Sequence, residues 1–311
     1  MKILLLGANG QVGHELLTTL RSSRRIIAAT RSGLIDDGTL CETADLADQP
    51  GLHALLERTR PNVIINAAAY TAVDRAELEA GLADCVNHQA LATLGNWARE
   101  NKALVVHYST DYVFDGSASL PYHENDPTAP LGVYGRSKLA GEDALRASGA
   151  RHFIFRTAWV YATRGSNFLR TMLRVGTQNE HLRIVDDQIG TPTSASLIAS
   201  RTVEVLLRWM KLDANDREQA LGTYHLTASV PCSWFEFATA IFDEAHLAGI
   251  IGRKPKLTPI PTSQYPTPAQ RPAWSVLDNS KIALVFGLAA PPWRQRLRDV
   301  ITQLREEKKP C

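Results

Sequence analysis

The sequence predicts an α/β fold in which a doubly wound parallel sheet is covered by helices on both faces. Short and almost wholly apolar runs alternate with helical patterns through the first half of the 311-residue chain. Strands this apolar are buried on both faces, which is typical of a parallel sheet. A glycine-rich segment directly after the first apolar run also predicts a tight turn from a strand into a helix.

The first half of the chain supplies the expected sheet. Continuous apolar runs predict strands at residues 3–6, 25–29, 63–66, 104–108 and 153–156. Apolar residues three to four apart predict helices at residues 12–20, 52–58, 82–100 and 134–147. Residues 116–131 are rich in proline, glycine and acidic side chains, so we expect a loop. Ligands of such sheets bind beyond the carboxyl ends of the strands, and we place this loop near that crevice.

The pattern becomes less regular after about residue 160. Helices are expected at residues 195–211, 234–248, 280–286 and 293–307, and one short strand at 223–226. The proline-rich residues 255–272 are expected to be irregular. We therefore expect a first domain over residues 1–160 that takes further sheet and helix elements from the 195–230 region. Residues 161–311 are expected to form mainly a smaller lobe, interleaved with the first domain.

Composition places the chain among ordinary globular proteins. Hydrophobic residues make up 44% of the chain and charged residues 21%, and the net charge of +2 favours neither nucleic acid nor an anionic membrane surface as a partner. No apolar run approaches the length of a membrane span, and the opening run is too short for a secretory segment. The cysteines are scattered, and the histidines show no metal-ligand spacing. The four cysteines are Cys41, Cys85, Cys232 and Cys311. We expect reduced thiols in a cytoplasmic protein, and a disulfide between distant cysteines stays open as the alternative.

Three glycines follow the first expected strand, at Gly7, Gly10 and Gly13. A pyrophosphate binds against backbone N–H groups at a helix N-terminus, where larger side chains would obstruct it. The first glycine permits the turn, the second permits close approach of the backbone, and the third permits close packing of helix on strand. The spacing is one residue longer than the usual dinucleotide fingerprint, and an ordinary strand–turn–helix junction is the alternative interpretation.

The second expected strand is followed by residues that indicate which dinucleotide binds. Thr30 and Arg31 come directly after it, and no carboxylate follows before Asp36. An acid at this place would favour NAD, whereas an arginine accommodates the 2′-phosphate of NADP. We therefore predict NADPH as the cofactor, with NADH as an alternative. The competing interpretation is that Arg31 is a solvated loop residue.

A tyrosine and a lysine lie four residues apart in an expected helix, at Tyr134 and Lys138. Side chains with this spacing share one helix face, so we expect the ammonium to lower the pKa of the phenol. Two hydroxyls, Ser109 and Thr110, end the preceding apolar strand, where a hydroxyl bonds a substrate carbonyl or caps a turn. Together with the glycine loop, this set indicates a short-chain dehydrogenase/reductase with an NADP(H)-binding Rossmann domain over residues 1–160.

Further motifs resemble the dTDP-4-dehydrorhamnose reductase family over essentially the whole chain. They include the glycine loop and the segments at 66–71, 73–74, 109–114, 133–135 with Lys138, 156–161, 190–193, 265–268 and 271–272. The resemblance implies NAD(P)H-dependent reduction of the C4 ketone of dTDP-4-dehydro-6-deoxy-L-mannose to dTDP-L-rhamnose. Tyr134 would be the proton donor, and the small-molecule nucleotide sugar would bind in the lobe formed mainly by residues 161–311.

The resemblance also implies roles for single residues. The catalytic set would be Thr110, Tyr134 and Lys138. The cofactor would meet Gly10, Gln11 and Val12 at its pyrophosphate, Asp45 and Leu46 at its adenine, and Ala68, Ala69 and Thr71 beside its nicotinamide. The sugar site would be lined by Asp111, Tyr112 and Trp159. From its own chemistry, Arg271 suits the substrate diphosphate, and an ion pair between the lobes is the equal alternative.

The chain departs from the family pattern in three places. Members that use NADH readily often carry an acid at the position of Thr30, whereas this chain has a threonine there. Members that dimerise through magnesium hold the ion with glutamates near the positions of Ser196 and Gln303. Neither residue of this chain is a carboxylate, so magnesium is doubtful here. We expect a monomer or weak homodimer. The family's Arg-Pro-x-Asn-Ser has a tryptophan, Trp274, in place of its asparagine.

Two other functions stay open. One is a nucleotide-sugar epimerase or dehydratase of the same superfamily, which would hold NAD tightly. A dehydratase tends to carry an acidic pair after the catalytic hydroxyl, whereas Asp111 is followed by Tyr112 here. The other is a non-catalytic dinucleotide-binding regulatory protein, which has no need of a proton donor such as Tyr134. The sequence does not distinguish a dTDP handle from a UDP handle.

Overall fold

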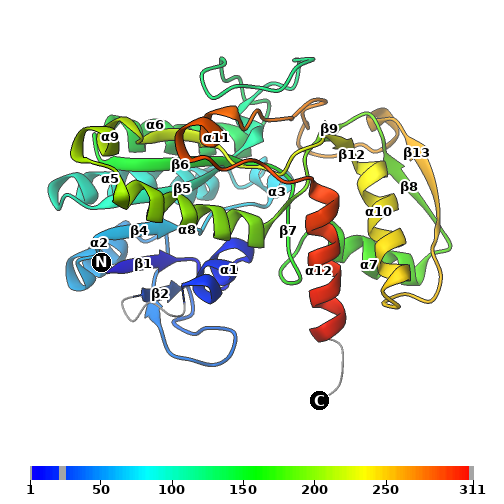
Figure 1. The fold of residues 1–311 in the computed structure, drawn as a ribbon, viewed down its shortest axis with the longest axis horizontal. Coiled ribbons are helices and arrows are strands. Elements are labelled where there is room, and N and C mark those ends of the chain that lie inside the picture. The colour runs from blue at the N-terminus through cyan, green and yellow to red at the C-terminus, as the bar shows by residue number, and fades with distance from the viewer. Residues whose placement is uncertain (1, 21–25, 308–311) are drawn as a thin grey trace.

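A parallel sheet of seven strands forms the centre of the larger lobe within residues 2–20 and 26–307, which the computed structural model describes (Figure 1). The strand order is β11-β6-β5-β4-β1-β2-β3. The strands are β1 (Ile3–Leu6), β2 (Ile26–Thr30), β3 (Glu42–Thr43), β4 (Val63–Asn66), β5 (Leu104–Thr110), β6 (Arg151–Thr157) and β11 (Gly222–His225). The predicted Rossmann-type α/β fold is confirmed. Residue 25, part of the second expected strand, lies outside the described residues.

Each face of the sheet is covered by its own set of helices because side chains alternate along the strands. In β1, Leu5 packs against α1 (Gln11–Thr19), α8 (Ala195–Lys211) and α11 (Ser280–Phe286) in one apolar core. Leu4 and Leu6 belong to a second core on the opposite face. That core includes side chains of α2 (Gln49–Thr59), α5 (Ala90–Glu100) and α6 (Val133–Ala147).

The smaller lobe has a third apolar core and lies to the right in Figure 1. Its helices are α7 (Phe168–Gln178), α10 (Trp234–Leu247) and α12 (Trp293–Glu307). Its strands pair two by two, as β8 (His181–Val185) with β13 (Lys256–Ile260), β9 (Ile189–Gly190) with β12 (Cys232–Ser233), and β7 (Val160–Tyr161) with β10 (Thr193–Ser194). Ser233 and Glu236 form a complete capping box, which explains where α10 begins.

Two expectations for the chain beyond residue 160 need correction. Residues 255–272 are not wholly irregular, because β13 runs through them and pairs in parallel with β8. Pro259 fits there because a strand with only one neighbour can spare an N–H group. The helix α7 was also not expected, although Asn167 caps its N-terminus through the N–H of Arg170.

The remaining helices are short. The expected helix over residues 82–100 consists of α4 (Ala80–Asp84), a π-helical turn (Cys85–Gln89) and α5. The others are α3 (Val73–Ala76), α9 (Ala214–Gln219) and single 3₁₀ turns at Asp111–Val113 and Thr262–Gln264. Residues 116–131 lie in a loop apart from an isolated bridge at Tyr122.

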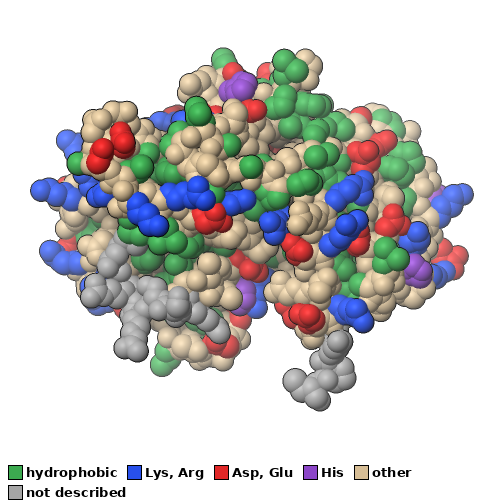
Figure 2. Space-filling view, viewed as in Figure 1, with side chains coloured by type: hydrophobic (Ala, Val, Ile, Leu, Met, Phe, Trp, Pro, Cys, Tyr) green, Lys and Arg blue, Asp and Glu red, His purple; other side chains and the backbone are tan. Residues whose placement is uncertain are grey.

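The chain enters the smaller lobe after β6 and then returns to the larger one. It returns with α8, which packs across α1, and with β11, which pairs with β6 at the edge of the sheet. The domain boundary near residue 160 stays a prediction. On the face shown in Figure 2, basic and acidic side chains are interspersed. None of the helices in the described part of the chain combines the length and apolarity needed to span a bilayer.

Candidate active site

A cavity of about 430 Å³ lies beyond the carboxyl ends of the central strands. Its wall includes Leu6 at the end of β1, Arg31 after β2, Ala67 after β4 and Ser109 near the end of β5. The strand order reverses between β1 and β4, and doubly wound sheets bind their ligands at such a point.

The glycine loop forms a cradle that side chains would fill. Gly7 has a φ of +77°, and a β-carbon there would lie 2.7 Å from the Ala68 nitrogen. A β-carbon at Gly13 would lie 2.0 Å from the Gly7 carbonyl oxygen. Gly10 is the N-cap of α1, and no described side chain caps this helix, so its first N–H groups lack the partners that most helices supply. These features fit the diphosphate of a dinucleotide.

Most of the residues that the sequence predicts for the cofactor lie on the wall of this cavity. They are Gly7, Gly10, Gln11, Val12, Arg31, Asp45, Leu46, Ala68, Ala69, Thr71, Tyr134 and Lys138. Gly13 and Thr30 are not on the wall. Gly13 packs beneath the loop, and the Thr30 hydroxyl accepts a hydrogen bond from Leu34 N at 3.1 Å. Thr30 therefore shapes the turn after β2 beneath Arg31.

Tyr134 is placed by the start of α6. The Glu77 carboxylate accepts a hydrogen bond from Val133 N at 2.8 Å, which fixes the first turn of the helix. Burial raises the pKa of Tyr134 to about 12, although a hydrogen bond with Thr110 acts in the opposite direction. The expectation that Lys138 lowers this pKa is therefore wrong for this structure.

The reason lies in where the lysine side chain points. Lys138 is buried, and its Nζ donates a hydrogen bond to the Tyr108 carbonyl oxygen at 2.6 Å. The same nitrogen lies 3.1 Å from Nε2 of His107. Burial lowers the pKa of Lys138 to about 7, with the Glu142 carboxylate acting against this effect. Sequence reasoning missed His107 because it lies inside the apolar run of β5, and a chemistry-bearing side chain in a buried strand is the only signal that could have found it.

The hydroxyl group and the acid that follow β5 are bonded to each other. Thr110 Oγ1 donates to Asp111 Oδ1 at 2.9 Å and accepts from Tyr112 N at 3.2 Å. Thr110 therefore caps a 3₁₀ turn and also neighbours the Tyr134 phenol. Burial raises the pKa of Asp111 to about 6, because water cannot solvate its charge.

We expect Asp111→Asn to stabilise the protein at pH 8 by about 1–3 kcal/mol. The folded pKa of about 6 lies above the ordinary value of 3.8, so the folded state loses stability as pH rises from about 4 to about 6. Asparagine has no charge to bury. Urea unfolding at pH 4 and pH 8 measures the difference, and an equal effect at both pH values would contradict this prediction.

A second cavity of about 550 Å³ lies in the smaller lobe, and two expected substrate residues line it. One is Tyr112, whose ring meets that of Tyr134 edge to face at 5.6 Å. Since Tyr134 lines the first cavity, this aromatic pair stands between the two spaces. The other is Arg271, whose Nη2 lies 2.8 Å from the carboxylate of Asp74 on α3. Its buried Nη1 has no hydrogen-bond partner among the residues described.

Trp159 does not line either cavity. Its ring stacks on Trp234 at 3.4 Å, and Trp234 itself lines the second cavity. Trp159 has a φ of +47°, which is uncommon for a bulky residue and holds the ring against Gly190. Its predicted contact with the sugar therefore stays a prediction.

Comparison with known proteins assigns the chain to a family. The RmlD substrate binding domain family matches residues 1–306. The dTDP-4-dehydrorhamnose reductase of Salmonella typhimurium is 42% identical over 304 residues, which cover 98% of each chain. This chain belongs to the dTDP-4-dehydrorhamnose reductase family. The resemblance inferred from the motifs is thereby confirmed.

Other members of the dTDP-4-dehydrorhamnose reductase family are similar in sequence and in structure. The protein of that name from Burkholderia thailandensis is 43% identical, covering 97% of this chain and all of its own. A dTDP-4-dehydrorhamnose reductase from Clostridium acetobutylicum superposes with a TM-score of 0.86 at 36% identity, covering 98% of this chain and 100% of that one. The reductase from Bacillus anthracis, solved in complex with NADP, has a TM-score of 0.85 at 32% identity, covering 97% and 100%.

Within the described part of this family member, no group of three or more His, Cys, Asp or Glu side chains could hold a metal ion. Ser196 and Gln303, at the positions where relatives were expected to bind magnesium, lie on α8 and α12. The thiols of Cys41, Cys85 and Cys232 are free, and Cys311 lies outside the described residues.

Proposed function

We propose that this chain reduces the C4 ketone of dTDP-4-dehydro-6-deoxy-L-mannose to dTDP-L-rhamnose, with NADPH as the hydride source and Tyr134 as the proton donor. The observation that carries this proposal is the position of Tyr134 between the cavity at the glycine loop and a second cavity in the smaller lobe. Family membership supports the same reaction, since relatives at 42% and 43% identity are named as this reductase.

The cradle at Gly7 and Gly10 would hold the cofactor diphosphate, with Arg31 beside the adenosine ribose and Ala68 beside the nicotinamide. Bound there, the cofactor supplies a hydride for the ketone carbon. The chain's own contribution is to position the sugar and to manage the proton.

Tyr134 donates its hydroxyl proton to the ketone oxygen as that oxygen becomes an alkoxide. Burial raises the pKa of Tyr134 to about 12, so the phenol carries its proton throughout the neutral range. Thr110 lies beside the phenol, and its single O–H, which is donated to Asp111 Oδ1 in this structure, would donate to the same alkoxide once turned towards the substrate. Positioned donors of this kind stabilise the charge that develops in the transition state.

Arg271 is suited to hold the substrate diphosphate in the second cavity. Its ion pair with Asp74 joins the two lobes and fixes the guanidinium plane, while the buried Nη1 keeps donor capacity. A fork of N–H groups matches phosphate oxygens in pairs. Both interpretations of Arg271 given by the sequence are therefore compatible with its position.

The decisive experiment is an NADPH-oxidation assay with dTDP-4-dehydro-6-deoxy-L-mannose, run beside its UDP counterpart and an NADH control. We expect oxidation of NADPH with formation of dTDP-L-rhamnose. Purified protein that retains NAD tightly and leaves the sugar unreduced would instead favour an epimerase or dehydratase. No turnover with either nucleotide sugar would favour a binding function.

Arg31→Ala is expected to lower kcat/KM for NADPH roughly ten-fold or more, because a charge-assisted contact to the 2′-phosphate is lost. The value for NADH should change little, since NADH has no phosphate there. Arg253→Ala is the matched control, because it removes an exposed arginine whose partner is Glu180. A strong preference of the unmodified protein for NADH would contradict the role given to Arg31.

Two further parts of this proposal concern the protein in the cell. We propose a monomer or weak homodimer that works in the cytoplasm on a small-molecule nucleotide sugar. Sedimentation at several protein concentrations, with and without magnesium, tests the oligomeric state.

A further inference from the structure

The amine of Lys138 lies at the end of a buried chain of polar side chains on β4 and β5. Asn66 and His107 are register partners on these neighbouring strands, and each is 1% exposed. Asn66 Nδ2 lies 3.3 Å from His107 Nδ1, and His107 Nε2 lies 3.1 Å from Lys138 Nζ. The amine thus connects through two side chains to the backbone beside the cofactor cavity.

The orientation of the Asn66 amide is fixed at its other end. Its oxygen accepts a hydrogen bond from Ala68 N at 3.2 Å, so its NH₂ group faces the imidazole. Because that NH₂ group can only donate, Nδ1 of His107 must accept. A neutral imidazole that accepts at Nδ1 carries its proton at Nε2. That proton points at Lys138 Nζ.

An ammonium group cannot accept this hydrogen bond, because all of its positions are donors. A neutral amine can, since its lone pair accepts from Nε2–H while one of its own N–H groups donates to Tyr108 O. Burial lowers the pKa of His107 well below its ordinary value and that of Lys138 to about 7. Both directions agree with two neutral partners above neutral pH.

We propose that Asn66 and His107 together set the protonation state of Lys138, as positioning residues for the catalytic lysine. In one arrangement Nε2–H of the imidazole donates to a neutral amine. When the amine gains a proton, it donates to Nε2, the imidazole proton moves to Nδ1, and the Asn66 amide turns over to accept it. The amide then gives up Ala68 N, which lies on the wall of the cofactor cavity.

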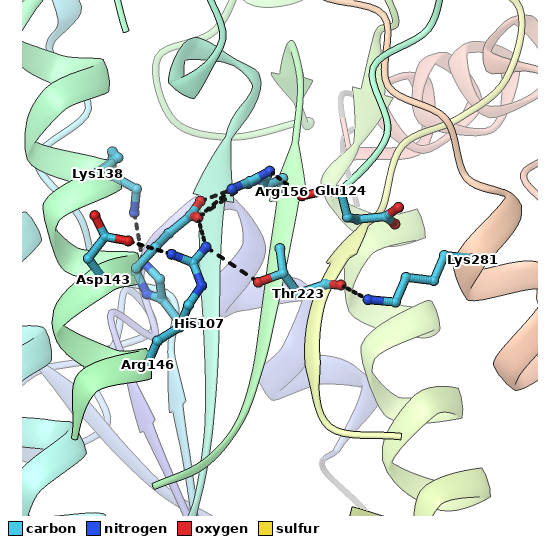
Figure 3. A network of polar contacts seen from close by, with 9 residues as sticks. His107, Glu124, Lys138, Asp143, Arg146, Arg156, Thr223 and Lys281 are labelled. Atoms are coloured by element: carbon cyan, nitrogen blue, oxygen red, sulfur yellow. Dashed lines mark hydrogen bonds and ion pairs between the residues drawn. The ribbon is translucent and has the colours of Figure 1, made fainter. Parts of the chain in front are cut away.

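The other charges near Lys138 are already engaged. Figure 3 shows Lys138 directed towards His107, while Arg146 and Arg156 converge on one carboxylate. That carboxylate belongs to Glu142, one helical turn beyond Lys138, and Arg156 Nη2 donates to it at 2.8 Å. Glu142 raises the pKa of Lys138 from a distance but is neutralised by its two arginines.

The remaining titratable groups lie on the substrate side of the lysine. Tyr134 is on the same helix face, and Asp111 acts on the Tyr134 phenol from the 3₁₀ turn after β5. Neither group bonds to the Asn66–His107 pair, so the imidazole is the nearest group that can respond to the charge of Lys138.

The test is nuclear magnetic resonance of the full chain labelled with ¹⁵N-histidine and ¹³C-lysine, with Lys138→Met used to assign the lysine signal. Above the Lys138 midpoint we expect His107 to carry its proton at Nε2. As pH falls through that midpoint, Nε2 of His107 should lose its proton and Nδ1 should gain one. A proton at Nδ1 at every pH, or no exchange while Lys138 titrates, would overturn the proposal, and this measurement needs no variant of His107.

His107→Gln provides a second test. Its amide oxygen can accept from the ammonium, so the Lys138 midpoint should rise by about one pH unit. His152→Gln is the matched control, since His152 is half-buried on β6 and bonds to Ala150 O. An unchanged midpoint in folded His107→Gln would overturn the proposal.

The significance of Lys138 for catalysis rests on the proposed function, but these signals do not. If the chain failed to reduce the sugar, the exchange of the ring proton would still be observed. If the function holds, the pH profile of kcat in His107→Gln should shift in the same direction as the lysine midpoint.

Discussion

Replacing Tyr134 with phenylalanine should lower turnover by roughly two to four powers of ten, because the ring stays and only the proposed proton donor is lost. NADPH affinity should change little, since the glycine loop, Arg31 and Ala68, which also line the cavity, are left unchanged. Steady-state NADPH oxidation gives turnover, and titration of NADPH fluorescence gives affinity. The split between the two quantities identifies a group that acts in the transition state.

Tyr224→Phe is the matched control for this change. Burial raises the pKa of Tyr224 to about 12 as well, yet its hydroxyl donates to Ala220 O in the core at the edge of the sheet. The variant therefore loses a buried phenol hydroxyl without losing the proposed proton donor. Near-normal turnover in Tyr134→Phe, or an equal loss in both variants, would rule out the assignment of the proton donor.

Gly13→Ala should lower the free energy of unfolding by about 2–4 kcal/mol and weaken NADPH binding ten-fold or more. The added β-carbon would lie 2.0 Å from the Gly7 carbonyl oxygen and 2.8 Å from its carbon. Both are backbone atoms, so the strain cannot be relieved by turning a side chain. The loop must move away from α1, and the cradle for the diphosphate moves with it.

Gly81→Ala separates this clash from the ordinary effect of alanine in a helix. Gly81 lies in α4, and a β-carbon there would meet no atom within 4 Å. Its stability should be unchanged or higher by about 0.5–1 kcal/mol. Urea unfolding and NADPH titration compare the two proteins. Equal behaviour of the two variants would show that close packing at Gly13 is unimportant.

The sequence was most informative where apolar runs and glycine chemistry act locally. The cores of β1, β4 and β5 were predicted because parallel strands buried on both faces leave a simple pattern. The strand β13 was missed because its proline suggests a loop, and only its pairing with β8 makes it a strand. The smaller lobe depends on such long-range pairs, which no local pattern reports.

In the site, too, local features could be predicted and long-range contacts could not. Spacing placed Tyr134 and Lys138 on one helix face, and both line the cavity. Spacing could not say which partner the long lysine side chain would choose, and it bonds to the backbone of Tyr108 and approaches His107. The pKa of the phenol followed burial instead of the charge one turn away. Desolvation depends on all the residues packed around a group, and these are not given by its neighbours in the sequence.

The return of the chain to the edge of the sheet has a consequence for synthesis on the ribosome. Among the described strands, β11 is the one that pairs with the outer side of β6, and its last residue is His225. Until about residue 225 has left the exit tunnel, β6 exposes unpaired backbone groups that invite association with other nascent chains. A gene fragment ending near residue 160 would keep this open edge permanently, so residues 1–160 should not be obtained as a stable protein by simple truncation.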